Sequence, residues 1–181
     1  EKWELIDGVP VMMPPPTLIH QRIAKNLERM LDARLSVVRP EWRADREIGV
    51  LLSGDEKYNP EPDVTIIDRE IAIGQLYATR FYGVAEVLSV TNRPEQAAGA
   101  DKPHVLAAKL GYYKLHEHCR SVLFVRQDRI EVDLHRRDAD AWSVVKLSEP
   151  EARIVLPELG DIGPLGDLYR DTPLWRAPAA G

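Results

Sequence analysis

The amino-acid sequence predicts an α+β sandwich in which helices pack on a sheet. Two segments show the helical spacing of apolar residues, and short apolar segments of strand length lie between and after them. The order of helix, several strands, helix and further strands favours this class over a doubly wound sheet with regular alternation. The chain has 181 residues, of which 44% are hydrophobic and 29% charged, so we expect one globular domain with a sizeable core.

A hairpin and a long helix are predicted near the start of the chain. Residues 3–6 and 9–13 read as two strands joined by an Asp-Gly turn. After three consecutive prolines, Thr17 is expected to be the N-cap of a helix that runs to about Leu35. Apolar residues at helical spacing define the buried stripe of this helix: Ile19, Ile23, Leu27, Met30 and Leu31.

The remaining segments are predicted to be strands, loops and one further helix. The expected strands are residues 42–52, 63–67, 84–90, 122–125, 129–134 and 141–147. A polar loop is expected over residues 53–61, and the second helix over residues 103–116. Beyond Glu149 we expect irregular structure with a short turn near Leu165–Tyr169. A single domain is predicted over residues 1–171, and a loose tail over 172–181.

Composition and charge restrict the possible functions. The net charge is −5 and the pI about 5.6, which argues against a tight, non-specific nucleic-acid binder. This acidity is compatible with an enzyme whose carboxylates hold a divalent metal ion. Cys119 is the only cysteine, so an internal disulfide is excluded and a reducing cytoplasm is expected. No apolar run has the roughly 18–20 residues of a membrane span, and no signal peptide is expected.

Two carboxylates are candidates for a metal site. Asp63 heads an otherwise apolar segment, and Glu86 interrupts another. A buried ionised glutamate needs a partner, and a metal ion shared with Asp63 would provide one, because Mg²⁺ prefers carboxylate and water oxygens. The structural alternatives are a strand-initiating turn aspartate after proline and an edge-strand glutamate that faces water.

Three further residues are candidates with weaker patterns. Lys109 lies at the edge of an apolar helical stripe, from where it could reach the sheet or extend along the surface into water. His20 falls on the buried arc of the first helix, where it is either a catalytic residue or an ordinary histidine of the core. Glu4 shares a strand face with Ile6 and is therefore expected to point inward. No other histidine shows metal-ligand spacing with a cysteine, and the pair around Glu117 reads as a solvated helix end.

Six motifs occur in order over about residues 1–168: Trp3-Glu-Leu-Ile-Asp-Gly8, Met13-Pro-Pro-Pro16, His20-Gln-Arg-Ile23, Pro62-Asp-Val64, Glu86-Val-Leu-Ser89 and Lys109-Leu-Gly-Tyr-Tyr113. No single motif is specific, but the ordered set is. Together they resemble the Uma-type restriction-endonuclease family, a branch of the PD-(D/E)XK nuclease superfamily.

This resemblance implies a restriction-endonuclease-like fold, a central mixed sheet flanked by helices in an α/β/α-like sandwich. It also implies an Mg²⁺-dependent phosphodiesterase site, in which Mn²⁺ can substitute, with Asp63 and Glu86 as metal ligands. Lys109 matches a helical lysine that replaces the superfamily's usual lysine, whose position here is Leu88. Glu4 and His20 match an N-terminal pair that completes the metal shell or assists proton transfer.

The sequence departs from the family pattern in two places. The second motif usually continues with a proline and a short basic turn, whereas here it reads Ser89-Val-Thr-Asn-Arg-Pro94. The aspartate that usually precedes the helical lysine has no match, and Asp101 is near but out of register. Both departures affect the rim of the site and leave its acidic pair and lysine in place.

We therefore expect a metal-dependent endonuclease that hydrolyses phosphodiester bonds in DNA. Lys109 would orient the attacking water or neutralise the phosphate, and His20 would pass a proton. The basic residues Arg22, Lys25 and Arg29 of the first helix, with Arg93 in the loop after Glu86, are candidates for DNA-backbone contacts or an ordinary charged surface. A homodimer is expected by analogy with nucleases that cut both strands. The alternatives are a catalytically inactive DNA-binding or dimerisation module and a carboxylate-metal hydrolase of a small phosphate ester.

Overall fold

The computed structural model describes residues 2–52, 54–89 and 102–175. Six strands form the main sheet in the order β10-β9-β8-β7-β5-β3, in which only the β7–β8 pair is parallel, so the sheet is mixed. The strands of this sheet are β3 (Trp42–Arg46), β5 (Val64–Asp68), β7 (Phe81–Leu88), β8 (Ser121–Arg126), β9 (Val132–Asp138) and β10 (Ala141–Leu147).

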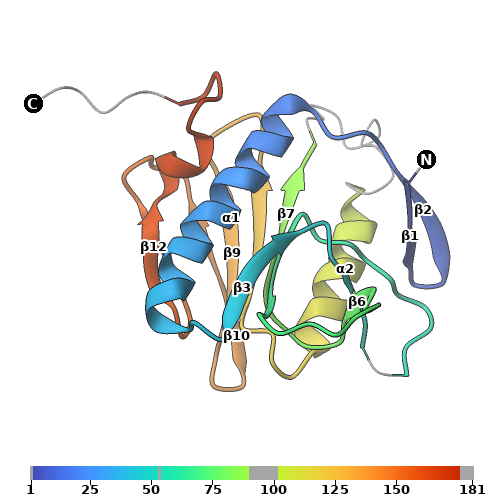
Figure 1. Cartoon of the computed structure of the whole chain (residues 1–181). Coiled ribbons are helices and arrows are strands. Elements are labelled where there is room, and N and C mark those ends of the chain that lie inside the picture. Colours follow the sequence, from blue (N-terminus) through green and yellow to red (C-terminus); the bar gives the residue numbers. More distant parts are fainter. Residues whose placement is uncertain (1, 53, 90–101, 176–181) are drawn as a thin grey trace, which may run out of the picture.

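The two predicted helices cover opposite faces of this sheet, which makes the fold a three-layer α+β sandwich (Figure 1). Helix α1 (Leu18–Val38) packs on one face together with the hairpin β11 (Arg153–Leu156) and β12 (Gly160–Pro164) and the 3₁₀ helix η3 (Leu165–Tyr169). Helix α2 (Pro103–Leu115) packs on the other face. The expected fold class, a central mixed sheet between helices, is confirmed.

Helix α1 forms where its apolar spacing predicts it. Its buried residues recur every three to four positions, which places them on one side of the helix: Ile23, Ala24, Leu27, Leu31 and Leu35. Thr17 is the N-cap, and its hydroxyl oxygen accepts a hydrogen bond from the backbone N–H of His20 at 3.1 Å. The predicted start of the helix is confirmed, and the helix extends three residues beyond the predicted end.

The substitution Thr17→Ala is expected to lower the free energy of unfolding by about 0.5–2 kcal/mol, because the His20 N–H loses its acceptor in the first turn. Thr17→Ser keeps the hydroxyl and is expected to retain most of this stability. Urea unfolding of the wild type and both variants measures the difference. Equal losses for alanine and serine would show that the hydroxyl does not cap α1.

The N-terminal hairpin is also confirmed. Strands β1 (Lys2–Ile6) and β2 (Val9–Met13) pair antiparallel, and their turn residues Asp7 and Gly8 both have positive φ, of 51° and 75°. Leu5 forms an isolated bridge with Asn59, which ties the hairpin to the polar loop. Glu4 points inward from β1, as predicted, and is 2% exposed.

Two sequence expectations for the sheet region were wrong. The segment 42–52 is not one strand, because Glu47 adopts a left-handed φ of 55° that ends β3. The short strand β4 (Gly49–Val50) follows and pairs with β6 (Tyr77–Ala78), a strand that the sequence did not predict. The region after Glu149 is not irregular but contains the β11–β12 hairpin. Its alternating buried residues, Ile154 and Leu156, complete the core on the α1 side.

The C-terminal part of the described chain stays attached to the core. Thr172 is buried, its hydroxyl donates to the carbonyl oxygen of Tyr169 at 2.6 Å, and Leu174 and Trp175 pack on the core. Residues 176–181 lie outside the described residues, so the loose tail and the domain boundary at 171 stay predictions. None of the helices in the described ranges is long and apolar enough to cross a membrane.

Sheet register brings the candidate residues to one edge. Val64 of β5 pairs with Ala85 of antiparallel β7, so Asp63 lies next to Glu86. Leu88 pairs with Arg126 of parallel β8, so the residues that follow these two strands, Ser89 and Gln127, emerge at the same edge. The candidate site therefore lies where β5 begins and where β7 and β8 end.

Candidate active site

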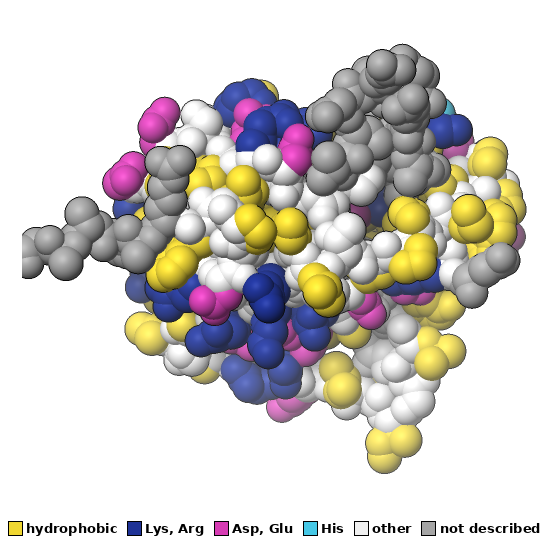
Figure 2. All heavy atoms as spheres, turned by 90° about the horizontal axis from the view of Figure 1, so that it is seen from above, with side chains coloured by type: hydrophobic (Ala, Val, Ile, Leu, Met, Phe, Trp, Pro, Cys, Tyr) yellow, Lys and Arg dark blue, Asp and Glu magenta, His cyan; other side chains and the backbone are white. Residues whose placement is uncertain are grey.

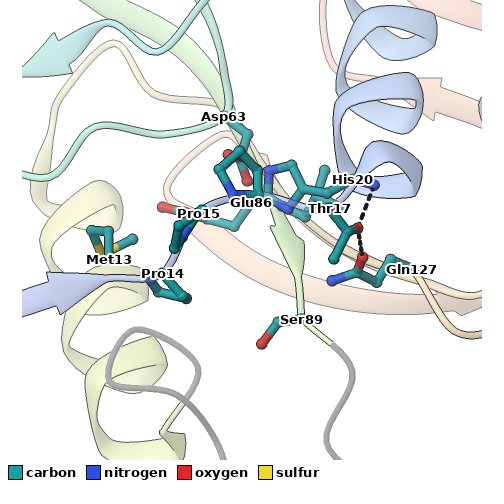
Figure 3. Close-up of a pocket in the computed structure, with 11 residues that line it drawn as sticks. Met13, Pro14, Pro15, Thr17, His20, Asp63, Glu86, Ser89 and Gln127 are labelled. Carbon is teal, nitrogen blue, oxygen red and sulfur yellow. Dashed lines mark hydrogen bonds and ion pairs between the residues drawn. The ribbon is translucent and has the colours of Figure 1, made fainter. Parts of the chain in front are cut away.

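A cavity of about 70 Å³ lies at this edge, roughly the space of two water molecules. Its walls come from the start of β5, the end of β7, the residue after β8, the proline segment before α1 and the first turn of α1. Thr17, His20, Asp63, Glu86 and Gln127 all line it, and Figure 3 shows these side chains around a common space. Three of the five predicted site residues thus share one cavity.

Asp63 is held by two contacts that fix its carboxylate. Its Oδ1 lies 2.8 Å from Nε2 of His20 on α1, and its Oδ2 accepts the backbone N–H of Val87 at 2.6 Å. The Asp63 side chain keeps 20% exposure, so it is accessible from the cavity. The alternative of a simple turn aspartate therefore does not describe it, because its contacts reach across to β7 and α1.

Glu86 is held from the opposite side by a buried ionic network. Nζ of Lys109 lies 2.8 Å from Oε1 of Glu86 and 2.8 Å from Oε2 of Glu4. The hydroxyl of Tyr113, one turn further along α2, donates to the same Oε1 at 2.5 Å. Because lysine and tyrosine both contact Oε1, these contacts leave Oε2 for another ligand at the cavity.

The structure decides between the alternatives for the buried residues. Glu86 sits on an inner strand and is 6% exposed, so it is not an edge residue in water. Lys109 is 1% exposed and does not extend along the surface. His20 contacts Asp63 in the cavity wall rather than only core side chains. His116, expected at a solvated helix end, is instead buried, stacks on Phe81 and bonds the Thr79 carbonyl at 3.0 Å.

Burial and charge give the network unusual proton affinities. Burial raises the pKa of Glu86 to about 7; Lys109 opposes this rise, and Glu4 and Asp63 add to it. Burial by itself would lower the pKa of Lys109, but the carboxylates of Glu86 and Glu4 outweigh it, so the lysine stays charged. Burial and the neighbouring Glu86 raise the pKa of Tyr113 well above its usual value, so it stays a hydrogen-bond donor.

The cavity offers a metal ion two carboxylates and room for water. Within the described ranges no group of three or more His, Cys, Asp or Glu side chains is placed to hold a metal ion. Asp63 and Glu86 nevertheless line one cavity, and Mg²⁺ in proteins is commonly held by one or two carboxylates with several waters. Two carboxylates contact one ammonium group here and the charge of Asp63 also acts on Glu86, and this excess negative charge favours a bound cation. The residues present therefore fit a hard divalent cation.

Sequence reasoning missed two residues of this region. Tyr113 was assigned to an apolar stripe, although its i+4 spacing from Lys109 places both on the same side of α2. Gln127 carried no signal, since it simply follows a strand. It reaches the cavity through the parallel pairing of β7 and β8, which the sequence does not specify.

The basic residues predicted to contact DNA lie on the outer side of α1. Arg22, Lys25 and Arg29 are exposed there, and the side chain of Arg22 donates to the carbonyl oxygen of Asp171. Figure 2 shows Lys and Arg side chains gathered with some Asp and Glu in its lower half, on the side of the molecule where α1 lies. Arg93 and Asp101 lie outside the described residues.

The fold is a mixed sheet between two helices. Its site combines the acidic pair Asp63 and Glu86 with a buried lysine, Lys109, that contacts Glu86. These features together define a nuclease-like α+β domain. The chain belongs to the Uma2 family, described as "Putative restriction endonuclease", whose model matches residues 1–163. It is similar in fold to a crystal structure described as a putative nuclease belonging to DUF820 from Anabaena variabilis ATCC 29413. The TM-score is 0.69 at 16% identity, covering 92% of this chain and 89% of that chain. No curated protein matches the chain significantly.

Proposed function

We propose that this protein is a metal-dependent endonuclease that hydrolyses phosphodiester bonds in DNA, with Asp63 and Glu86 as ligands of Mg²⁺. The observation that carries the proposal is that both carboxylates line one cavity while a buried lysine holds one of them. Membership of a restriction-endonuclease family supports the nuclease class. When bound, Mg²⁺ would supply an acidified water and neutralise charge on the phosphate.

The residues around the cavity have distinct roles in this proposal. Asp63 presents a carboxylate that the Val87 N–H and His20 keep in one orientation. Lys109 does not line the cavity, so we infer that it acts through Glu86, whose ionised form it stabilises, rather than on the attacking water. Glu4 is the second partner of Lys109, and its Oε1 accepts the backbone N–H of Glu61, which anchors the hairpin β1–β2 beside the site.

Nicking of supercoiled plasmid DNA tests the proposed activity. We expect single- and double-strand cleavage with Mg²⁺ or Mn²⁺ and none with excess chelator. An RNA of matching sequence and a small phosphodiester, bis-p-nitrophenyl phosphate, serve as comparison substrates. Hydrolysis of the small ester without DNA cleavage would favour the phosphate-ester alternative, and no hydrolysis of any substrate would favour the inactive module. Cleavage of both strands at one site would support the homodimer, which sedimentation velocity tests directly.

Metal affinity is expected to depend on pH because the Glu86 carboxyl must lose its proton to bind the ion. With a pKa of about 7, this carboxyl holds a proton below pH 7 in the metal-free protein. Mn²⁺ affinity should therefore fall about tenfold per pH unit below 7 and level off above it. Calorimetry at pH 6 in two buffers of different ionisation enthalpy counts the protons released. The finding that would contradict this is an affinity equal at pH 6 and pH 8 with no proton release.

A further inference from the structure

Gln127 is a buried amide in the wall of the cavity that the proposed mechanism does not use. It follows β8 directly and is 2% exposed, yet it lines the cavity with Asp63 and Glu86. Its Oε1 accepts the hydroxyl proton of Thr17 at 2.6 Å. Its Nε2 makes no hydrogen bond with any part of the chain that the structure describes. Nε2 is not among the fully enclosed atoms that lack a partner, so its two N–H donors are open to an acceptor that enters the cavity.

The orientation of this amide is fixed by the cap of α1. The Thr17 hydroxyl oxygen accepts the His20 N–H, and its proton goes to Gln127 Oε1, so the carbonyl end of the amide faces the helix. Figure 3 shows the amide nitrogen turned away from Thr17, toward strand β7 between Glu86 and Ser89. In the reverse orientation the Thr17 hydroxyl proton would lose this acceptor.

We propose that Gln127 donates hydrogen bonds to a non-bridging oxygen of the substrate phosphodiester, and that the first turn of α1 forms the other half of this phosphate subsite. The inference rests on the proposed function. The N-terminus of the 21-residue helix α1 opens on the cavity through Thr17 and His20, and the positive end of a helix dipole favours a phosphate oxygen. A preorganised amide donor also costs no reorganisation when charge develops on phosphate.

A test that does not depend on cleavage uses side-chain amide resonances in ¹⁵N spectra of the Asp63→Asn protein. The Gln127 Nε2–H₂ pair, identified by its loss in Gln127→Met, is expected to shift saturably when a 12-base-pair DNA duplex is added. Gln75 is the control, because its amide donates to the carbonyl oxygen of Tyr77 within its own loop, and it should not move. An unmoved Gln127 pair beside shifting His20 and Val87 backbone signals would overturn the subsite alone. No shift anywhere would overturn the subsite and the proposed function together.

Kinetics of the metal-loaded protein provide the second arm. Gln127→Met, which keeps the side-chain length, should lower kcat on DNA about 100-fold or more, the effect of removing one preorganised donor. Its KM and Mn²⁺ affinity should stay within about twofold. Thr17→Val should lower kcat less, and Thr17→Ser should restore it, since serine keeps the hydroxyl that orients the amide. Wild-type kcat in a folded Gln127→Met protein would overturn the proposal, and equal losses in kcat and Mn²⁺ affinity would show a merely structural role.

Discussion

Replacing Asp63 by asparagine should lower the single-turnover rate of DNA cleavage about 1000-fold or more while the protein stays folded. Asparagine keeps the shape of the side chain and an oxygen that can accept the Val87 N–H, so the local packing survives. It loses the negative charge that the proposed metal site requires. A catalytic ion contributes several kcal/mol to transition-state stabilisation, and each 1.36 kcal/mol corresponds to about a factor of ten in rate.

The matched control is Asp68→Asn at the other end of the same strand. Asp68 accepts the Tyr82 hydroxyl at 2.7 Å and does not line the cavity, so cleavage should stay within about twofold of wild type. Gel analysis of plasmid nicking and urea unfolding of both variants separate lost chemistry from lost structure. Cleavage by Asp63→Asn at the wild-type rate would remove Asp63 from the active site.

Replacing Lys109 by methionine is expected to lower the free energy of unfolding by about 3–5 kcal/mol at pH 8. Methionine fills similar space but leaves Glu4 and Glu86 buried without their ammonium partner, and an uncompensated buried charge has a cost of this size. The loss should be smaller at pH 5. At pH 5 the Glu86 carboxyl, with its raised pKa, is protonated in the folded state, so it has no charge that needs the ammonium partner. As pH rises through 7 this carboxyl ionises, and the stabilisation that its bound proton provides is lost.

Two comparisons make this stability prediction specific. Glu4→Gln and Glu86→Gln added to Lys109→Met should recover most of the loss, because neutral amides replace the unpaired charges. Lys114→Met on the same helix removes a partly exposed lysine that packs over Trp142, and it should change stability by less than about 1 kcal/mol. Urea unfolding at pH 5 and pH 8 measures all variants. If Lys109→Met and Lys114→Met lowered the free energy of unfolding equally and at both pH values, the ion pairs of Lys109 with Glu4 and Glu86 would contribute no more to stability than a surface lysine.

Local patterns were sufficient for the features that depend on local physics. The N-cap at Thr17, the Asp-Gly turn and the apolar stripe of α1 are short-range signals, and the structure contains each of them. The residue pattern and the family resemblance both predicted that Asp63 and Glu86 share a site, and sheet register explains why they are neighbours.

Features that depend on long-range pairing were not predictable from the same patterns. Lys109 looks like a surface lysine until Glu4, 105 positions earlier in the chain, and Glu86 are placed around its ammonium group. Gln127 gains its place only because β8 lies parallel to β7. The β11–β12 hairpin was missed because β11 is only four residues long and β12 has a single aliphatic residue, Ile162, among glycine, aspartate and proline positions that resemble a loop.

Mn²⁺ titration calorimetry at pH 8 tests the central claim most directly, with wild type beside an Asp63→Ala, Glu86→Ala double variant. The proposed site predicts saturable binding to the wild type that disappears in the folded double variant, with and without a DNA duplex present. Saturable binding that persists unchanged in the double variant, or no binding by the wild type even with DNA, would contradict a metal site at these two carboxylates.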